Sequence, residues 1–342
     1  MNVLVTGGAG YIGSHAALRL LGDGHAVTVV DDFSRGHREA LETLAPLGDL
    51  HVVEANFGDQ PEMTGLLRDR SIDLVMHFAA LTYVGESVEN PLRYYRNNTA
   101  NAVALLEAMH EAGVRRFVFS STAATYGEPA PEFIPITESC PQQPVNPYGR
   151  SKLVVEEILG DYAQAPATGG EAFAFAALRY FNVAGADRQG RIGEVHDPET
   201  HLVPICLEAA LGKRDAVTIF GTDYDTPDGT CVRDYVHVED LIDAHVTVMD
   251  ALRPGDRRAY NIGIGAGYSV REVIDACRRV SGVDFAAIEG ARRPGDPPVL
   301  YSDPGRIRDE LGWSASITDL GEIIDTAWRW HRAHPDGYAT DS

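Results

Sequence analysis

The sequence predicts an α/β protein of the Rossmann type, with a doubly wound parallel sheet and a smaller C-terminal substrate-binding lobe. Three observations predict this class. Short, almost wholly apolar segments alternate with helical patterns in the first half of the chain, a glycine-rich turn follows the first segment, and the alternation breaks near Tyr180. Strands that are apolar along their whole length are typical of parallel sheets covered on both faces.

The elements of the first half follow from this alternation. Between the last predicted helix and strand, Pro166, Gly169 and Gly170 predict a surface loop. Strands are predicted at Val3–Thr6, Ala26–Val30, His51–Glu54, Leu74–Phe78, Phe117–Ser121 and Phe173–Arg179, and helices at Ile12–Leu21, Glu39–Leu44, Met63–Arg68, Asn98–Glu111 and Tyr148–Tyr162.

The second half has fewer regular patterns and longer polar loops. Helices are predicted at Val203–Gly212, Val270–Val280 and Leu320–His331. Long ordered loops in a compact chain usually carry function. We therefore expect a nucleotide-binding domain over residues 1–180 and a lobe over residues 181–342, with room for some later segments to pack back on the first domain.

Composition narrows the classes of protein. The 342 residues carry a formal net charge of −21, which disfavours a nucleic-acid partner. The four cysteines form no C-x-x-C pair and show no metal-ligand spacing with histidine, so we expect reduced thiols and no metal. No signal-peptide or membrane-helix pattern is present, and the sequence predicts a cytoplasmic protein without a membrane partner.

A glycine-rich loop follows the first strand and opens a helix. Gly8, Gly10 and Gly13 have the G-x-G-x-x-G spacing that lets a backbone approach a pyrophosphate at a helix N-terminus. Asp31 ends the second strand and is placed to bind a ribose 2′-hydroxyl, which favours NAD. Arg35 is the counter-argument, because a nearby arginine accepts a 2′-phosphate, but Asp32 beside Asp31 tips the balance to NAD.

Tyr148 and Lys152 are one helical turn apart and form a candidate catalytic pair. A tyrosine needs a pKa well below ~10 to act as a base at neutral pH. A lysine ammonium and a nicotinamide cation nearby would both favour the phenolate, which could take a proton from a sugar hydroxyl as hydride leaves the same carbon. Thr122 ends a strand at the sheet's carboxyl edge, where ligands bind, and could supply a hydroxyl.

These motifs resemble the extended short-chain dehydrogenase/reductase family, and within it the UDP-galactose 4-epimerases. The resemblance runs from about Val3 to Trp330. It is carried by Val3-Leu4-Val5-Thr6-Gly7-Gly8-Ala9-Gly10-Tyr11-Ile12-Gly13, Val84-Gly85-Glu86-Ser87, Ser120-Ser121-Thr122-Ala123-Ala124-Thr125-Tyr126-Gly127, Asn146-Pro147-Tyr148-Gly149-Arg150-Ser151-Lys152, Leu178-Arg179-Tyr180-Phe181-Asn182 and Asp228-Gly229-Thr230-Cys231-Val232-Arg233-Asp234-Tyr235-Val236-His237.

The resemblance implies an NAD-dependent epimerase that interconverts UDP-glucose and UDP-galactose as a homodimer. It implies that Tyr148 is the base, that Lys152 binds the nicotinamide ribose and that Thr122 contacts the reacting hydroxyl. The implied cofactor contacts are Gly7, Gly10, Tyr11, Ile12, Gly13, Asp31, Asp32, Asn56, Phe57, Phe78, Ala79, Ala80, Asn97, Ser120, Tyr148, Lys152 and Tyr180. The implied substrate contacts are Thr122, Tyr148, Asn182, His201, Leu202, Phe220, Arg233, Tyr235, Arg293, Asp296 and Leu300.

Departures from the family pattern separate the possible reactions. Related 4,6-dehydratases follow the active-site Thr with Asp-Glu, and UDP-glucuronate decarboxylases usually have a Glu at the second of these positions. Here the residues are Ala123 and Ala124, whose methyl groups cannot transfer protons. Asn56 stands where an Asp often holds the adenine amino group, and its amide oxygen could accept the same bond.

Several alternatives stay open. A UDP-N-acetylglucosamine or UDP-pentose 4-epimerase would use the same residues, and a non-enzymatic NAD sensor is disfavoured because Tyr148 and Lys152 are both kept. The resemblance places Leu300 where the family gates the sugar's C2 substituent. Leucine there predicts secondary activity on UDP-N-acetylhexosamines, unless Leu300 packs in the core or Tyr301 fills the space.

Overall fold

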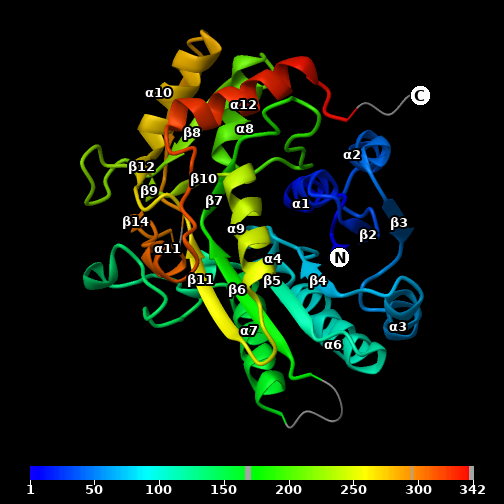
Figure 1. The fold of residues 1–342 in the computed structure, drawn as a ribbon. Helices are drawn as coiled ribbons and strands as arrows, with labels where there is room; N and C mark the ends of the chain where they lie inside the picture. The colour runs from blue at the N-terminus through cyan, green and yellow to red at the C-terminus, as the bar shows by residue number, and fades with distance from the viewer. Residues whose placement is uncertain (166–170, 294–295, 339–342) are drawn as a thin grey trace. The chain divides into compact units, whose positions relative to one another are not determined.

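A seven-stranded sheet organises the first half of the chain in the computed structural model, which describes residues 1–165, 171–293 and 296–338. The strand order is β11-β6-β5-β4-β1-β2-β3, and the pairs from β5 to β3 are all parallel. Because the chain moves from β1 toward both edges, this order confirms the doubly wound Rossmann class (Figure 1). The strands are β1 (Asn2–Thr6), β2 (Ala26–Asp31), β3 (Leu50–Glu54), β4 (Leu74–His77), β5 (Arg116–Thr122), β6 (Ala174–Tyr180) and β11 (Arg257–Ile262).

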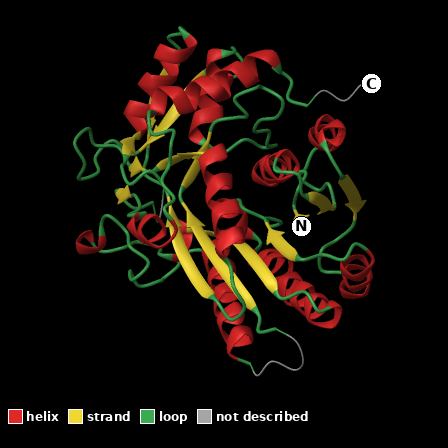
Figure 2. Cartoon of the chain, viewed as in Figure 1, coloured by secondary structure: helices red, strands yellow, loops and turns green. Residues whose placement is uncertain are grey.

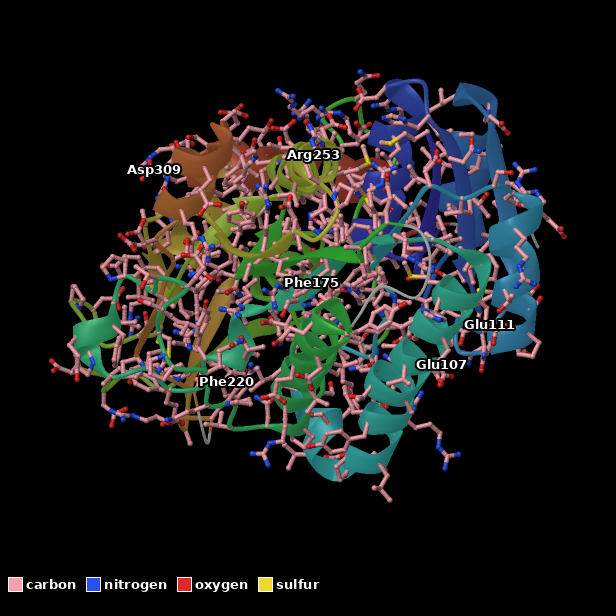
Figure 3. All side chains as sticks on the ribbon, turned by 60° about the horizontal axis from the view of Figure 1, so that its bottom comes forward. Glu107, Glu111, Phe175, Phe220, Arg253 and Asp309 are labelled. Atoms are coloured by element: carbon pink, nitrogen blue, oxygen red, sulfur yellow. The ribbon has the colours of Figure 1, made fainter. Side chains whose placement is uncertain are left out.

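Helices connect and cover these strands (Figure 2). Buried side chains of α3, α6 and α7 form one apolar core with the sheet, which includes Phe175 of β6. Glu107 and Glu111 lie on the exposed side of α6 (Figure 3). The helices are α1 (Tyr11–Gly22), α2 (Arg38–Leu44), α3 (Gln60–Asp69), α4 (Val84–Glu89), α5 (Pro91–Tyr94), α6 (Asn101–Ala112), α7 (Pro147–Gln164) and α9 (Val238–Ala251), with short 3₁₀ turns at Ala45–Leu47, Ala123–Thr125 and Pro131–Phe133.

The strands and helices predicted for the first half are present, with ends shifted by a few residues. The largest shifts are of three residues: the helix predicted from Met63 begins at Gln60, and the helix predicted from Asn98 begins at Asn101 because Tyr95–Ala100 forms a π-helical turn. Asn98 lies in this turn, and its side chain bonds both backbone groups of Leu81. The short helices α4 and α5 were not predicted, since six or four residues show no helical period, and the 14-residue helix α9 was missed as well.

Besides α9 and β11, the described residues of the second half form short strands and four more helices. The strand pairs are β7 (Asn182–Ala184) with β10 (Tyr235–His237), β9 (Val232–Arg233) with both β12 (Tyr268–Ser269) and β14 (Val299–Leu300), and β8 (Ala216–Phe220) with β13 (Ala286–Gly290). The helices α8 (Leu202–Ala210), α10 (Val270–Ser281) and α12 (Leu320–Ala333) share an apolar core and confirm the three helices predicted here. The fourth helix, α11 (Gly305–Leu311), was not predicted.

The chain divides into two units by its internal contacts. The first holds Met1–Gly127, Gln142–Arg179 and Ile242–Tyr260, and the second Glu128–Pro141, Tyr180–Leu241 and Asn261–Ser342. The functional boundary predicted at residue 180 stays a prediction. Residues 166–170 of the predicted surface loop lie outside the described residues. Every helix of the described residues is too short or too polar to cross a bilayer.

Candidate active site

The glycine loop sits where the parallel sheet reverses its winding, between β1 and β4. The backbone N–H groups of Phe78 and Ala79 both donate to the carbonyl of Thr6, at 3.0 and 3.1 Å. Gly7 has φ of +71°, and a Cβ there would lie 2.6 Å from the nitrogen of Ala79. A Cβ on Gly13 would lie 2.1 Å from the carbonyl oxygen of Gly7.

The loop therefore needs glycine at these two positions and leads directly into α1. Tyr11 and Ile12 begin that helix, and Gly10 is its N-cap residue without a side chain to cover the free N–H groups. Uncovered N–H groups at a helix N-terminus favour an anion such as a pyrophosphate. The residues present thus fit a dinucleotide such as NAD.

Asp31 ends β2 and is tied to the glycine loop. Its carboxylate accepts hydrogen bonds from the backbone N–H groups of Ala9 and Phe33, both at 2.9 Å. Burial raises the pKa of Asp31, and these two hydrogen bonds oppose that rise. Asp32 accepts from the backbone and hydroxyl of Ser34. Two carboxylates at the end of β2 suit a ribose hydroxyl and repel a 2′-phosphate.

Arg35, the residue that could have favoured NADP, has other partners. Its guanidinium lies 4.3 Å from the centre of the Tyr83 ring and 3.2 Å from the carboxylate of Glu86. The hydroxyl of Tyr94 donates to the same carboxylate at 2.9 Å. Arg35 is therefore held by Tyr83 and Glu86, and the choice of NAD rests on the two carboxylates at the end of β2.

At the expected adenine end, Asn56 has hydrogen-bond partners within the protein. The side-chain oxygen of Asn56 already accepts from the backbone N–H of Gly58, at 2.8 Å, and from the amide of Asn101, at 3.1 Å. An amide oxygen has two lone pairs, so an adenine amino group would have to displace one of these donors. Phe57 is buried against His77, and Asn97 lies in the π-helical turn and donates to Asn98.

The candidate catalytic residues come together at the end of β5 and the start of α7. Asn146 caps α7 by accepting from the backbone N–H of Gly149, and Tyr148 and Lys152 follow on one buried face of the helix. The Tyr148 hydroxyl interacts with Thr122, which ends β5. The ammonium of Lys152 donates to the carbonyl of Ser120 at 2.9 Å. Strand β5 thus holds both residues of the pair.

The electrostatics of this pair differ from the simple expectation. Burial raises the pKa of Tyr148, and only the hydrogen bond with Thr122 acts in the opposite direction. Burial also lowers the pKa of Lys152 to about 7, against the pull of Glu156. Burial thus penalises the charged form of both side chains, and the effect of Lys152 and the nicotinamide cation on the Tyr148 phenolate stays a prediction.

A buried ion pair supports this helix, and sequence reasoning missed it. Arg179 of β6 lies 2.6 Å from Glu156 of α7, and both side chains are 8% exposed. Arg179 also donates to Tyr126 at 2.9 Å, and Ser121 of β5 donates to Glu156. The signal available in the sequence was Arg179, a single charged residue in an otherwise apolar strand. The helix before this strand carries Glu156.

In the second unit, strand pairing gathers part of the candidate substrate set. Asn182 of β7 is in register with Tyr235 of β10, and Arg233 of β9 with Leu300 of β14. Arg233 is ion-paired with Asp296. Burial raises the pKa of Tyr235, which stays a neutral phenol. Two-residue strands have no readable periodicity, so this pairing was not visible in the sequence.

The remaining candidates lie at ends of elements in the same unit. The guanidinium of Arg293 stacks over Phe220, at the end of β8, with 3.9 Å to the ring centre. His201 is the N-cap residue of α8, and Leu202 begins that helix. Burial alone would lower the pKa of His201, but Glu194 and Glu199 raise it to about 10.

The remaining cofactor candidates are Ala80, just after β4, and Tyr180, at the end of β6.

Comparisons with known proteins agree with this geometry. Residues 3–263 match the NAD dependent epimerase/dehydratase family. The chain is 47% identical to a probable UDP-arabinose 4-epimerase of Oryza sativa subsp. japonica, covering 99% of this chain and 84% of that protein. It is 46% identical to a UDP-glucose 4-epimerase of Lacticaseibacillus casei, covering 99% of each.

A solved structure gives the same result. A UDP-glucose-4-epimerase of Stenotrophomonas maltophila, crystallised with NAD and formylated UDP-arabinopyranose, superposes with a TM-score of 0.91 at 41% identity, covering 98% of this chain and 99% of that one. The chain belongs to the NAD dependent epimerase/dehydratase family and is an NAD-dependent epimerase.

Proposed function

We propose that this enzyme interconverts UDP-glucose and UDP-galactose by inverting carbon 4 of the hexose. The observation that carries the proposal is that Tyr148 and Lys152 lie buried on one face of α7 beside strand β5, where Lys152 donates to the Ser120 carbonyl at 2.9 Å and Thr122 acts on the pKa of Tyr148. Ala123 and Ala124 follow Thr122 directly. Neither can transfer a proton, so hydride removal and return at one carbon is the chemistry that remains.

The chain's own residues handle the proton in this reaction. When bound, NAD would accept the hydride from carbon 4 and would return it to the opposite face of the sugar. The Tyr148 oxygen takes the proton of the C4 hydroxyl and returns it after the 4-keto sugar has rotated about its link to UDP. The Thr122 hydroxyl stabilises the Tyr148 phenolate by a hydrogen bond, and Lys152 is proposed to hold the nicotinamide ribose.

Anchoring of the diphosphate is assigned to arginines of the second unit. The protein carries a net charge of −21, so an anionic substrate needs a local cationic site. Arg233 is 12% exposed in its side chain and is oriented by Asp296, while Arg293 is stacked on Phe220. A guanidinium whose position is fixed by such contacts is suited to bidentate binding of phosphate oxygens.

A UDP-pentose 4-epimerase is the second candidate, favoured by the 47% identity to a probable UDP-arabinose 4-epimerase. The deciding experiment incubates the pure protein with UDP-glucose, UDP-galactose, UDP-arabinopyranose and UDP-N-acetylglucosamine, without added nicotinamide, and separates the products by chromatography. We expect the fastest turnover with the two hexoses. Faster turnover of the pentose would select the second candidate, and stoichiometric consumption of NADPH would contradict epimerisation altogether.

Leu300 is proposed to set the width of the space beside the sugar's C2 substituent. It lies in β14, in register with Arg233, and is partly buried. We expect secondary activity on UDP-N-acetylglucosamine that is ~10–200-fold weaker than on the hexose, because one small group in an apolar site discriminates by ~1–3 kcal/mol.

The Leu300→Tyr variant should lose the activity on the acetylated sugar and keep that on UDP-galactose, measured as kcat/KM for each. The neighbouring Tyr301→Ala variant is the control, since it removes the ring and so tests whether Tyr301 fills the space instead. Equal losses on both substrates in Leu300→Tyr would show that Leu300 is not the gate.

Homodimer formation and a cytoplasmic location complete the proposal. Val84 and Val88, one turn apart on α4, are 47% and 62% exposed, and Leu92 of α5 is 81% exposed. Adjacent exposed apolar side chains favour burial against a second copy. The four cysteines are buried free thiols, which suits a reducing compartment. Light scattering of the pure protein would give the mass of the assembly.

A further inference from the structure

A cluster of two histidines and two glutamates lies in the segment before α8. Glu194, His196, Glu199 and His201 each offer one ligating atom, and these four atoms lie within 4.8 Å of one another. We call these residues the Glu/His quartet. The expectation of no metal rested on the cysteines and did not consider this E-x-H-x-x-E-x-H spacing.

The distances within the quartet have the size that a metal ion requires. Nδ1 of His196 lies 3.2 Å from Glu194 and 3.5 Å from Glu199, and Nδ1 of His201 lies 3.0 Å from both. Tetrahedral zinc with bonds of ~2.0–2.1 Å holds its ligand atoms about 3.3 Å apart. The four nitrogen–oxygen distances are close to this value, with His196 facing one oxygen of Glu199 and His201 facing the other, so a tetrahedral ion would need one Glu199 oxygen to turn toward both imidazoles.

The segment is fixed in a way that supports a preformed site. Gly193 packs on the Trp330 ring so closely that a Cβ would lie 2.3 Å from it, and its N–H donates to the Tyr338 hydroxyl at 3.0 Å. One oxygen of Glu199 accepts from the backbone N–H groups of Thr200 and His201, both at 2.7 Å. Such outer hydrogen bonds orient a carboxylate for metal binding.

Burial argues against a merely solvated cluster. The side chains of Glu194 and Glu199 are 5% and 4% exposed and that of His196 is 19% exposed, whereas His201 closes the cluster toward solvent at 42%. Two buried carboxylates need cationic partners, and a divalent ion with two neutral imidazoles satisfies them as completely as two imidazolium ions do. Four protein ligands would leave no open position, which is typical of a structural site.

We propose that the Glu/His quartet binds a divalent cation of the zinc type as a structural site at the start of α8. The ion would fix the segment 194–201 and the first turn of α8, where His201 and Leu202 lie. The binding itself does not depend on which sugar the enzyme uses. Only its effect on substrate affinity, through His201 and Leu202, rests on the proposed function.

The test uses the whole protein, stripped with a chelator and titrated with ZnCl₂. We expect one zinc ion per chain by elemental analysis after gel filtration, a rise in Tm on zinc addition, and proton release on binding, because the imidazoles must be neutral to bind. His196→Ala and Glu199→Gln should each weaken zinc binding by more than the roughly 10–100-fold that loss of an outer partner costs.

The controls are His51→Ala and Glu107→Gln, which change exposed residues of the first unit and should leave zinc binding intact. Since one variant could fail to fold, His201→Asn gives an independent measurement, and circular dichroism checks each variant. Zinc that stays below stoichiometric amounts, or that binds all variants equally, would overturn the proposal. Variants that lose stability with no zinc dependence in the parent protein would identify the quartet as ion pairs only.

Discussion

The Tyr148→Phe variant should lose kcat by ~10²–10⁴-fold, the usual contribution of general base catalysis, while it still binds the UDP-sugar. The change removes the phenol oxygen that interacts with Thr122 and lies on the buried face of α7. Steady-state kinetics with UDP-galactose gives kcat, and calorimetry with UDP gives the binding affinity. Tyr162→Phe on the same helix is the matched control and should keep normal turnover.

Thr122 variants sharpen the same test. Thr122→Ser keeps the hydroxyl and should retain most of kcat, whereas Thr122→Ala removes the hydrogen bond that lowers the pKa of Tyr148. The alanine variant should therefore lose less activity than Tyr148→Phe and shift the pH optimum upward. If Tyr148→Phe turned over at a near-normal rate, the assignment of the base would be wrong.

Arg179→Leu should destabilise the protein by about 3–5 kcal/mol, since it leaves the buried carboxylate of Glu156 without its partner. Both side chains are 8% exposed, and the pair joins α7 to β6 at 2.6 Å. Urea denaturation followed by circular dichroism gives the free energy of unfolding. Arg70→Leu is the control: its partner Asp49 is 70% exposed at 3.8 Å, and its loss should cost no more than ~1 kcal/mol.

The double variant Arg179→Leu with Glu156→Leu separates the charge from the packing. Replacing both members of a buried pair with apolar residues is often close to neutral, so the double variant should recover much of the lost stability. A double variant as unstable as Arg179→Leu alone would show that Tyr126 and Ser121, which also bond this pair, matter more than the unpaired charge.

A feature could be predicted from the sequence when the residues that form it lie close together along the chain. The glycine loop could be predicted because its requirements are local: Gly7 needs a positive φ and Gly13 packs on Gly7 six residues away. The Tyr148–Lys152 pair could be predicted because one helical turn places both on one face. The alternation of apolar strands and helices likewise gave the Rossmann class and eleven elements close to their observed ends.

Tertiary structure alone decided the electrostatics and the pairing of short segments. The lowered pKa of Lys152 results from its burial. Arg35 is held by a hydrogen bond to Glu86, which lies 51 residues later in the sequence. The quartet Glu194–His201 could be located in the sequence, but only the fold fixes its 3.0–3.5 Å edges.

The sequence by itself determined the fold class, the dinucleotide loop and the tyrosine–lysine pair, because each depends on residues within one strand, turn or helix. Tertiary structure decided that Arg233 meets Asp296 and pairs with Leu300, and that Glu156 meets Arg179. These contacts join residues 23 to 67 positions apart. The periodicity of a helix or a strand relates only residues close in the sequence, so packing alone selects these partners.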